Sequence, residues 1–344
     1  MAVHVVTGGS GFVGNHIAKA LKNRGEEVIV YDLIDTPDRS EDIEYIQGDI
    51  LDYDRVLSTF KEAEYVHHNV ALVPLTKAGK RFWDVNVVGT KIALEAAEKA
   101  GIKKFVHMSS SAVFGIPDDC PITEKTRLSP IEIYGRAKYA GELEVTNYML
   151  ANKPAAIIRP RTIVGGHGRL GIFQILFEWI NENRKIYIIG KGDNLFQFVH
   201  IHDIVEADIL AAYSPINGIY NIGSACYGTL REELESIINY AESRSSVVSL
   251  PVKPAISALK FLDYIKLSPL APWHYLTYHK PFVFDTSKAQ KELGWNPRYG
   301  NQELLRESYD WYIRNYNDWK TRGESSVHRK SVKQGMLKLL KLLP

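Results

Sequence analysis

The sequence predicts an α/β protein whose core is a doubly wound parallel sheet, followed by a smaller C-terminal α/β lobe. Two observations support this fold class. Apolar runs of strand length alternate with segments of helical apolar spacing through the first half of the chain, which is the rhythm of a parallel sheet. In addition, the first apolar run, Val3 to Val6, leads through a glycine-rich turn, Thr7 to Gly14, into a helical segment.

The remaining elements follow in a regular order. The first helix is expected to end at Gly25, because glycine commonly follows a helix C-terminus. Asp52 is placed to cap a helix that runs to Phe60, and Gly101 ends a long amphipathic helix. Strands are expected at residues 28–32, 43–49, 65–71, 104–108 and 155–159, and helices at residues 84–100 and 134–150. Shorter strands follow at residues 186–189, 198–201 and 220–222.

The composition is that of an ordinary soluble globular chain, with 344 residues, 24% charged residues and a net charge of +2. This balance indicates no nucleic-acid partner. Cys120 and Cys226 are too few for a disulfide framework and lack metal-ligand spacing, so we expect ordinary thiols, a reducing compartment and no bound metal. The sequence shows neither a signal peptide nor an apolar run of membrane-spanning length. We therefore expect a cytoplasmic protein.

The glycine turn has the spacing G-x-x-G-x-x-G, and each glycine meets a physical need. Gly8 allows a tight turn, Gly11 allows backbone amides to approach a pyrophosphate, and Gly14 allows the helix to pack closely on the strand. The N-terminus of the helix then offers unpaired N–H groups to the phosphates. We predict a dinucleotide-binding Rossmann unit whose cofactor contacts here are Gly8, Ser10, Gly11, Phe12, Val13 and Gly14.

The predicted cofactor is NAD. Asp32 ends the second strand about twenty residues after the glycine turn, where a carboxylate binds the ribose hydroxyls of NAD. The same charge would repel the 2′-phosphate of NADP. Asp49 and Ile50 follow the third strand and are expected to contact the adenine, while Ala71 ends the strand that passes under the cofactor.

A serine-rich strand end and a tyrosine–lysine pair form the predicted catalytic group. The fifth strand leads into Ser109, Ser110 and Ser111, and Tyr134 and Lys138 lie four residues apart on one helical face. A free tyrosine, with a pKa of about 10, is a poor base at neutral pH, but a neighbouring ammonium stabilises its phenolate. Tyr134 can then exchange a proton with an alcohol or carbonyl oxygen that a serine hydroxyl holds, while the cofactor carries the hydride.

These motifs together resemble those of the extended short-chain dehydrogenase/reductases, the group that contains nucleotide-sugar epimerases, dehydratases and 3β-hydroxysteroid dehydrogenases. The resemblance extends from Val3 to roughly Tyr316. It rests also on Asn86-Val87-Val88-Gly89-Thr90, Arg159-Pro160-Arg161-Thr162-Ile163-Val164-Gly165, Phe198-Val199-His200-Ile201-His202-Asp203-Ile204, Asp285-Thr286-Ser287-Lys288-Ala289 and Leu293-Gly294-Trp295.

The resemblance assigns roles to particular residues. It implies Ser110 as the catalytic hydroxyl, with Ser111 as the fallback, beside Tyr134 and Lys138. It adds Asn86, Tyr134 and Lys138 to the expected cofactor contacts. It also implies a homodimer that is joined through the long helices containing Asn86 and Tyr134.

The reaction type is narrowed by the residues beside Ser110. Dehydratases and decarboxylases of this group resemble one another in needing an acid next to the catalytic hydroxyl, and the next two positions here are Ser111 and Ala112. Neither can shuttle protons in an elimination, so dehydration and decarboxylation are disfavoured. Epimerisation and simple oxidoreduction of an alcohol or ketone remain.

The substrate pocket departs from that of sugar-nucleotide epimerases. Phe196 stands where those enzymes usually have an arginine that grips the diphosphate, and Thr162 stands where many have an asparagine. Lys280 lies where a second arginine is expected, and lysine does not replicate the bidentate fork. Arg161, Arg169 and Lys280 are candidates to compensate. The predicted substrate contacts are Ser111, Thr162, Phe196 and Lys280.

Three functions stay open at this point. The favoured one is a 4-epimerase-type enzyme that acts on a sugar nucleotide or a lipid-linked sugar. The alternative is an oxidoreductase of the 3β-hydroxysteroid-dehydrogenase type on a bulky apolar alcohol or ketone, a branch that the apolar, proline-rich run from Pro251 to Pro272 also resembles. The third is a non-catalytic NAD-binding sensor, which the intact Tyr134–Lys138 pair disfavours.

We divide the chain into three parts. Residues 1–165 form the NAD-binding domain, with contributions from later segments, residues 166–320 form mainly the substrate-binding lobe, and residues 321–344 form a basic tail. In the tail, Val327 to Leu343 has the spacing of a basic amphipathic helix, which suits peripheral contact with the inner face of a membrane. Docking on the protein itself or on a second subunit is the alternative.

Overall fold

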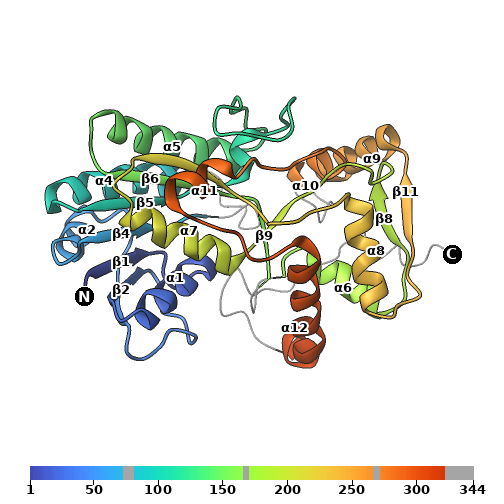
Figure 1. Cartoon of the computed structure of the whole chain (residues 1–344), viewed down its shortest axis with the longest axis horizontal. Coiled ribbons are helices and arrows are strands. Elements are labelled where there is room, and N and C mark those ends of the chain that lie inside the picture. The colour runs from blue at the N-terminus through green and yellow to red at the C-terminus, as the bar shows by residue number, and fades with distance from the viewer. Residues whose placement is uncertain (73–80, 166–169, 266–271, 322–344) are drawn as a thin grey trace.

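The computed structural model describes residues 1–72, 81–165, 170–265 and 272–321. Its centre is a seven-stranded sheet in the order β10-β6-β5-β4-β1-β2-β3, and every pairing in this sheet is parallel (Figure 1). The doubly wound parallel sheet predicted from the sequence is therefore confirmed. The strands are β1 (Val3–Thr7), β2 (Glu27–Asp32), β3 (Glu44–Gln47), β4 (Tyr65–His68), β5 (Lys104–Met108), β6 (Ala155–Pro160) and β10 (Gly218–Ile222).

Helices cover both faces of this sheet, because their apolar positions recur at helical spacing and need a surface to pack on. On one face, Ile17, Ile204 and Leu293 join the buried side chains of the strands in one core. On the other face, Phe60, Leu94 and Val145 form a second core with the same strands. The first layer contains α1 (Phe12–Asn23), α7 (Ile201–Tyr213) and α11 (Ser287–Leu293), and the second contains α2 (Tyr53–Phe60), α4 (Gly89–Ala100) and α5 (Ile133–Leu150).

The expected helix ends are found at α2 and α4. The Asp52 side chain accepts a hydrogen bond from the Arg55 backbone N–H at 3.1 Å, and Gly101 ends α4 with a φ of 73°. The helix expected over residues 84–100 differs at its start, where α3 (Arg81–Trp83) leads into a π-helical turn over Asp84–Val88. Such turns are rare and occur frequently at functional sites, and this one contains Asn86.

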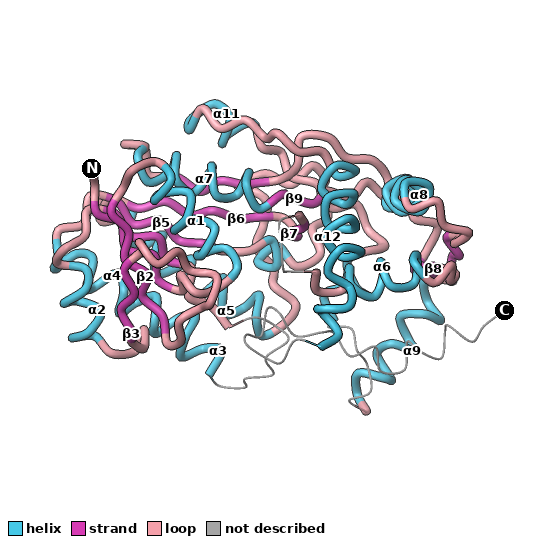
Figure 2. Tube along the Cα trace, turned by 90° about the horizontal axis from the view of Figure 1, so that it is seen from below, coloured by secondary structure: helices cyan, strands magenta, loops and turns pink. Residues whose placement is uncertain are grey.

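A smaller lobe follows the carboxyl end of β6 and packs around a separate apolar core. The chain later returns from the lobe to the sheet, because β10 pairs with β6 at the sheet edge. In the view of Figure 2, α6 and α8 lie away from the sheet, and α9, which has no buried residue, projects from the lobe. The lobe contains β7 (Thr162–Val164), β8 (Ile186–Ile189), β9 (Phe198–His200), β11 (Val247–Leu250), α6 (Phe173–Asn181), α8 (Leu230–Tyr240), α9 (Val252–Tyr264), α10 (Pro272–Thr277) and α12 (Asn301–Thr321).

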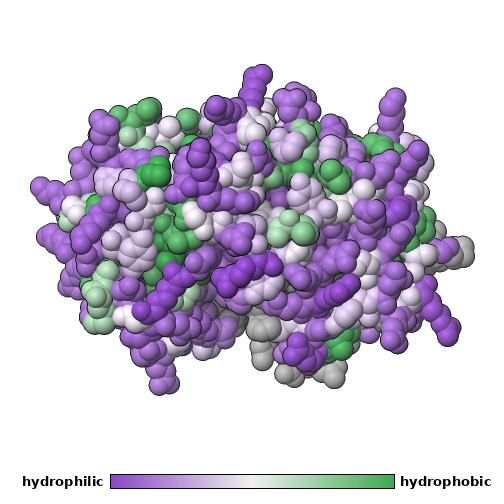
Figure 3. All heavy atoms as spheres, in the orientation of Figure 1, coloured by the Kyte–Doolittle hydropathy of each residue, from purple (hydrophilic) through white to green (hydrophobic). Residues whose placement is uncertain are grey.

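The surface in the view of Figure 3 is largely hydrophilic, with scattered apolar residues. No described helix has both the length and the apolar character that crossing a bilayer requires. Cys120 and Cys226 are free and exposed. In the described part of the chain, His, Cys, Asp and Glu side chains form no group of three or more that could hold a metal ion. The predicted amphipathic helix from Val327 to Leu343 lies outside the described residues.

Candidate active site

The glycine turn between β1 and α1 is closely packed at its first and last glycines. Gly8 has a φ of +69°, and a Cβ on it would lie 2.7 Å from the backbone nitrogen of Val70. A Cβ on Gly14 would lie 2.4 Å from the carbonyl oxygen of Gly8, so a side chain at either position would displace backbone. At Gly11 the one described atom within 4 Å of an added Cβ would be that same carbonyl oxygen, at 3.1 Å.

The same turn brings the N-terminus of α1 to the carboxyl end of β1. Gly11 occupies the N-cap position and provides no side-chain hydrogen bond to the amides of Phe12, Val13 and the following turn. Such amides attract phosphates through their hydrogen bonds and the helix dipole. The residues therefore fit a dinucleotide whose pyrophosphate lies against Gly11 and the N-terminus of α1.

Asp32 lies beside this turn, at the end of β2. Its carboxylate accepts hydrogen bonds from the backbone N–H groups of Ser10, at 3.1 Å, and Leu33, at 2.7 Å. Burial raises the pKa of this carboxyl above its usual value, while the backbone donors act in the opposite direction. Asp32, the residue predicted to bind the ribose, is therefore hydrogen-bonded to Ser10 of the glycine turn, which is predicted to bind the phosphates.

We expect Asp32→Ala to weaken NAD binding about ten- to a hundredfold, the range of hydrogen bonds to a charged group, while NADP binding falls much less. Calorimetric titration with both dinucleotides measures the change in their ratio. Asp35→Ala is the matched control, because Asp35 is an exposed carboxylate three residues away that pairs with Arg39 at 2.8 Å. An NAD-to-NADP ratio that stays the same in Asp32→Ala would remove this residue from the cofactor site.

The other predicted cofactor contacts lie at the carboxyl ends of β3 and β4 and in the π-helical turn. The Asp49 backbone oxygen accepts a hydrogen bond from the Tyr31 hydroxyl at 2.8 Å, and Ile50 is buried. Ala71 comes shortly after β4 and is half-buried. Asn86 is buried and donates to the Leu72 backbone oxygen at 3.4 Å, and its side-chain oxygen has no hydrogen-bond partner among the described residues.

Lys138 is the best-defined member of the predicted catalytic group. It is buried in α5, and its Nζ donates a hydrogen bond to the Met108 backbone oxygen at 2.5 Å, where β5 ends. Burial lowers the pKa of this ammonium to about 8, and the charge of Glu142 opposes the shift. Tyr134 is half-buried one turn earlier on the same helix. The contact with Met108 thus joins the tyrosine–lysine helix to the strand that carries the serines.

Ser110 and Ser111 follow β5 and differ in their surroundings. The Ser110 hydroxyl is half-buried and accepts a hydrogen bond from the Ala112 N–H at 3.2 Å, which leaves it able to donate. Ser111 is buried and accepts from Arg161 Nη1 at 3.3 Å. A Cβ on Gly135 would lie 2.7 Å from the Ala112 backbone oxygen, so α5 approaches this serine segment closely.

A buried ion pair beneath Lys138 was not predicted. Glu142 lies one turn beyond Lys138, and its carboxylate accepts three hydrogen bonds from the Arg159 guanidinium at 2.6–3.1 Å. The Ser109 hydroxyl donates to the same carboxylate. The sequence could have suggested Glu142, because it lies four residues after Lys138 on the helix face that also carries Tyr134. No nearby residue pattern indicates Arg159 as its partner.

Arg161 lies in an aromatic cage that includes Phe196. Its guanidinium carbon is 4.1 Å from the ring centre of Phe282 and 4.9 Å from that of Phe196, and both rings are buried. Burial lowers the pKa of Arg161 to about 9. Nε and Nη2 of Arg161 have no hydrogen-bond partner in the described ranges. Phe196, predicted as a substrate contact, is therefore connected to the serine segment indirectly. Its ring packs on Arg161, and Arg161 donates a hydrogen bond to Ser111.

Thr162 and Lys280 both lie near Tyr278, a residue that was not predicted. Burial raises the pKa of the Tyr278 hydroxyl, and the nearby Thr162 side chain acts in the opposite direction. The Tyr278 ring centre lies 4.8 Å from that of Phe196. Lys280 is exposed, and its backbone oxygen accepts from Asn194 Nδ2 at 2.9 Å. Arg169 lies outside the described residues.

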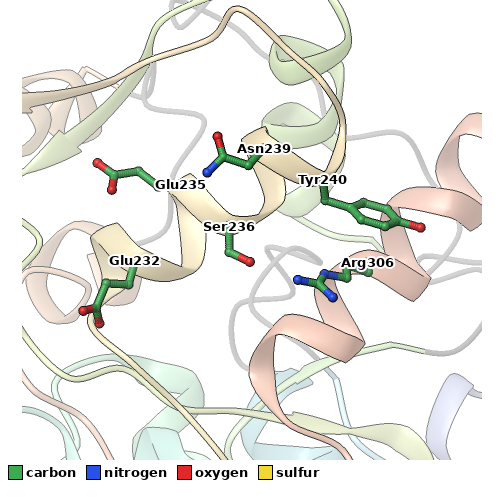
Figure 4. Close-up of a pocket in the computed structure, with 6 residues that line it drawn as sticks. All are labelled: Glu232, Glu235, Ser236, Asn239, Tyr240 and Arg306. Carbon is green, nitrogen blue, oxygen red and sulfur yellow. The ribbon is translucent and has the colours of Figure 1, made fainter.

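Two cavities of the lobe are lined by described residues, and the residues that line them include none of the predicted site residues. One is an open hollow of about 500 Å³ between α8 and α12, lined by Glu232, Tyr240, Arg306 and neighbouring polar side chains (Figure 4). The other, of about 200 Å³, is apolar and includes Tyr278 in its wall. Tyr278 thus lies between the second cavity and the predicted site.

The parallel sheet, the glycine turn and the tyrosine–lysine helix define an extended short-chain dehydrogenase/reductase. The chain belongs to the NAD dependent epimerase/dehydratase family, whose model matches residues 4–223. This match confirms both the family indicated by the sequence motifs and NAD as the cofactor.

Similar proteins cover almost the whole chain. An uncharacterized protein of Sinorhizobium fredii is 43% identical over 98% of this chain and 85% of its own length. A putative UDP-glucose 4-epimerase of Methanocaldococcus jannaschii is 28% identical over 90% and 98%, and a mouse dTDP-D-glucose 4,6-dehydratase is 26% identical over 92% and 90%. Among solved structures, UDP-glucose 4-epimerase from Thermotoga maritima, with UDP-glucose, has a TM-score of 0.76 at 23% identity, covering 91% of this chain and 99% of that one.

Proposed function

We propose that this protein is an NAD-dependent 4-epimerase-type enzyme for a sugar carried on a nucleotide or on a lipid, and that Ser110, Tyr134 and Lys138 perform the reaction. The observation that carries the proposal is the buried Lys138 ammonium, fixed 2.5 Å from the Met108 oxygen and one helical turn from Tyr134. The resemblance to UDP-glucose 4-epimerases supports the choice of substrate class.

Each residue has a distinct task in this proposal. The Ser110 hydroxyl donates a hydrogen bond to the reacting sugar oxygen. Tyr134, as a phenolate stabilised by Lys138, takes the proton of the sugar hydroxyl and later returns it to the oxygen of the opposite epimer. NAD supplies a hydride acceptor and donor at the sugar carbon, so that the carbonyl formed in the first half is reduced in the second. Ser111, held by Arg161, fixes the segment that carries Ser110.

The distinguishing experiment is an incubation of the purified chain with a panel of hexoses linked to UDP, to dTDP or to an alkyl chain. Proton NMR would follow epimer formation, absorbance would follow NADH, and mass spectrometry would identify small molecules released from the protein. We expect bound NAD, a new epimer and no net NADH. Accumulating NADH without an epimer would instead support an alcohol oxidoreductase, and loss of the substrate hydroxyl would support a dehydratase.

We expect kcat/KM to fall as the pH rises through about 8, because Lys138 then loses the charge that stabilises the Tyr134 phenolate. The decline is measured as a pH–rate profile of the wild-type protein. Lys104 provides a matched control, since burial also lowers the pKa of its ammonium, which instead bonds the Ile216 oxygen at 2.9 Å. Lys104→Met should retain the alkaline decline, and a profile that stays flat to pH 10 in the wild type would contradict the role of Lys138.

We also propose the homodimer and the cytoplasmic location that the sequence suggested. Apolar side chains are exposed on the helices that the dimer would use, with Val88 41% and Leu143 44% exposed. Burying such side chains against a second copy would remove apolar surface from water. Contact of the tail with a membrane stays a prediction.

A further inference from the structure

The apolar cavity of the lobe is a pocket whose wall combines buried side chains with half-buried ones such as Leu176 and Ile189. Its volume is about 200 Å³, and its walls come from α6, β8, α8 and α10. Ile175, Trp179, Ile188 and Leu234, four of the side chains that line it, are all buried. Sites for small molecules are concave and lined mainly by apolar and aromatic side chains. The cavity has this character.

The cavity is connected to the predicted active site through Tyr278. Tyr278 forms part of the cavity wall, and its side chain lies near that of Thr162. Its ring packs against Phe196, which in turn packs against Arg161, the residue that donates to Ser111. A substrate that extends from the serine segment past Thr162 would reach this cavity.

The lining favours a hydrocarbon over a nucleobase. A base needs partners for its donor and acceptor edge, and burying that edge without them is costly. Glu233 is the carboxylate of the lining. Its Oε1 accepts hydrogen bonds from the Gly228 N–H at 2.6 Å and Asn301 Nδ2 at 3.1 Å, and its Oε2, which has no partner among the described residues, is an acceptor that offers nothing to the carbonyl oxygens of a base. An engineered cavity of about 150 Å³ lined by similar apolar side chains binds benzene. The present cavity is therefore large enough for an alicyclic ring or a short stretch of an aliphatic chain.

We propose that this cavity binds the apolar part of a lipid-like carrier to which the substrate sugar is attached. The inference rests on the proposed function, because it places the sugar at Ser110 and Tyr134 and the carrier beyond Tyr278. The proposal also explains why Phe196 stands where related epimerases have a diphosphate-binding arginine. A hydrocarbon carrier next to the sugar would contact an aromatic ring, whereas a nucleotide carrier would need the arginine.

Binding of n-alkyl β-D-glucopyranosides tests the proposal. Hexyl, heptyl and octyl glucosides are titrated calorimetrically, below their micelle concentrations, into the full chain with NAD. Affinity should rise about fourfold with each methylene group, the increment expected for burying one CH₂. Leu176→Phe, on a half-buried part of the wall, and Ile188→Phe should each weaken octyl glucoside binding about tenfold or more by filling the cavity. Two variants are used so that misfolding of one leaves the test intact.

The matched control is Ile216→Phe, the same substitution at a residue that is 40% exposed and lies outside the cavity lining. It should bind octyl glucoside as the wild type does. Affinity that is independent of chain length, equal weakening in the control, or displacement of the glucoside by UDP would each overturn the proposal. Because no turnover is measured, these outcomes are separate from failure of the proposed function, which is read from epimer formation.

Discussion

Replacing Tyr134 with phenylalanine is expected to lower kcat by at least about a hundredfold, the lower end of what a positioned general acid or base contributes. The substitution removes the hydroxyl that exchanges the proton and keeps the ring that packs at the start of α5. NAD binding should therefore remain within a few fold of the wild type. Epimer formation by NMR and NAD binding by calorimetry measure the two effects separately.

Tyr148→Phe is the matched control for this experiment. Tyr148 lies on the same helix, near its end, and its ring contacts the Lys153 ammonium at 5.2 Å, far along the helix from Lys138. Removing the Tyr148 hydroxyl should leave kcat unchanged. Wild-type turnover in Tyr134→Phe would exclude the proposed proton transfer, and loss of NAD binding together with turnover would point to a structural defect instead.

Glu142→Ala is expected to lower the free energy of unfolding by about 3–5 kcal/mol, the cost of leaving one partner of a buried ion pair alone. Arg159 and Glu142 are both buried, and the substitution removes three hydrogen bonds from the guanidinium. Among the described residues, Arg159 would keep its approach to the Phe114 ring, whose centre lies 5.1 Å from the guanidinium carbon. Urea unfolding of the variant and the wild type measures the difference.

The control for this prediction is a surface pair of the same chemistry. Arg231 and Glu235 lie 3.2 Å apart on α8, and both side chains are substantially exposed. Exposed pairs contribute about 0–1 kcal/mol, so Glu235→Ala should change the unfolding free energy only slightly. If both variants lost the same stability, burial would not be what makes the Glu142 pair important.

The sequence predicts the sheet and its helices well because their signals are local. Each parallel strand is a short apolar run, and caps such as Asp52 and Gly101 mark helix ends within a few residues. The tyrosine–lysine spacing is local in the same way, and Lys138 is found where that spacing requires, next to the end of β5. The spacing of apolar residues did not predict the π-helical turn at Asn86. Such a turn adds only about one residue to a helical turn, which is too small a change to alter that spacing clearly.

Contacts between distant segments could not be read in this way. Three examples are the pairing of β10 with β6, the aromatic cage around Arg161 and the approach of Tyr278 to Thr162. Each joins residues that lie more than fifty positions apart or in separate elements. Phe196 illustrates the consequence. Its position in a motif suggested a place in the substrate pocket. In the structure it packs against Arg161 together with Phe282, and nothing in the sequence near Phe196 predicts that Phe282 lies there.

The buried ammonium of Lys138 has opposite effects on turnover and on the stability of the fold as the pH changes. Its pKa falls from 10.5 to about 8 in the folded protein, so between these values the unfolded chain binds more protons and the folded state gains stability as the pH rises. Turnover is expected to change in the opposite direction over the same interval. As far as this one side chain is concerned, the conditions that favour the reaction are those in which the native fold is weakest.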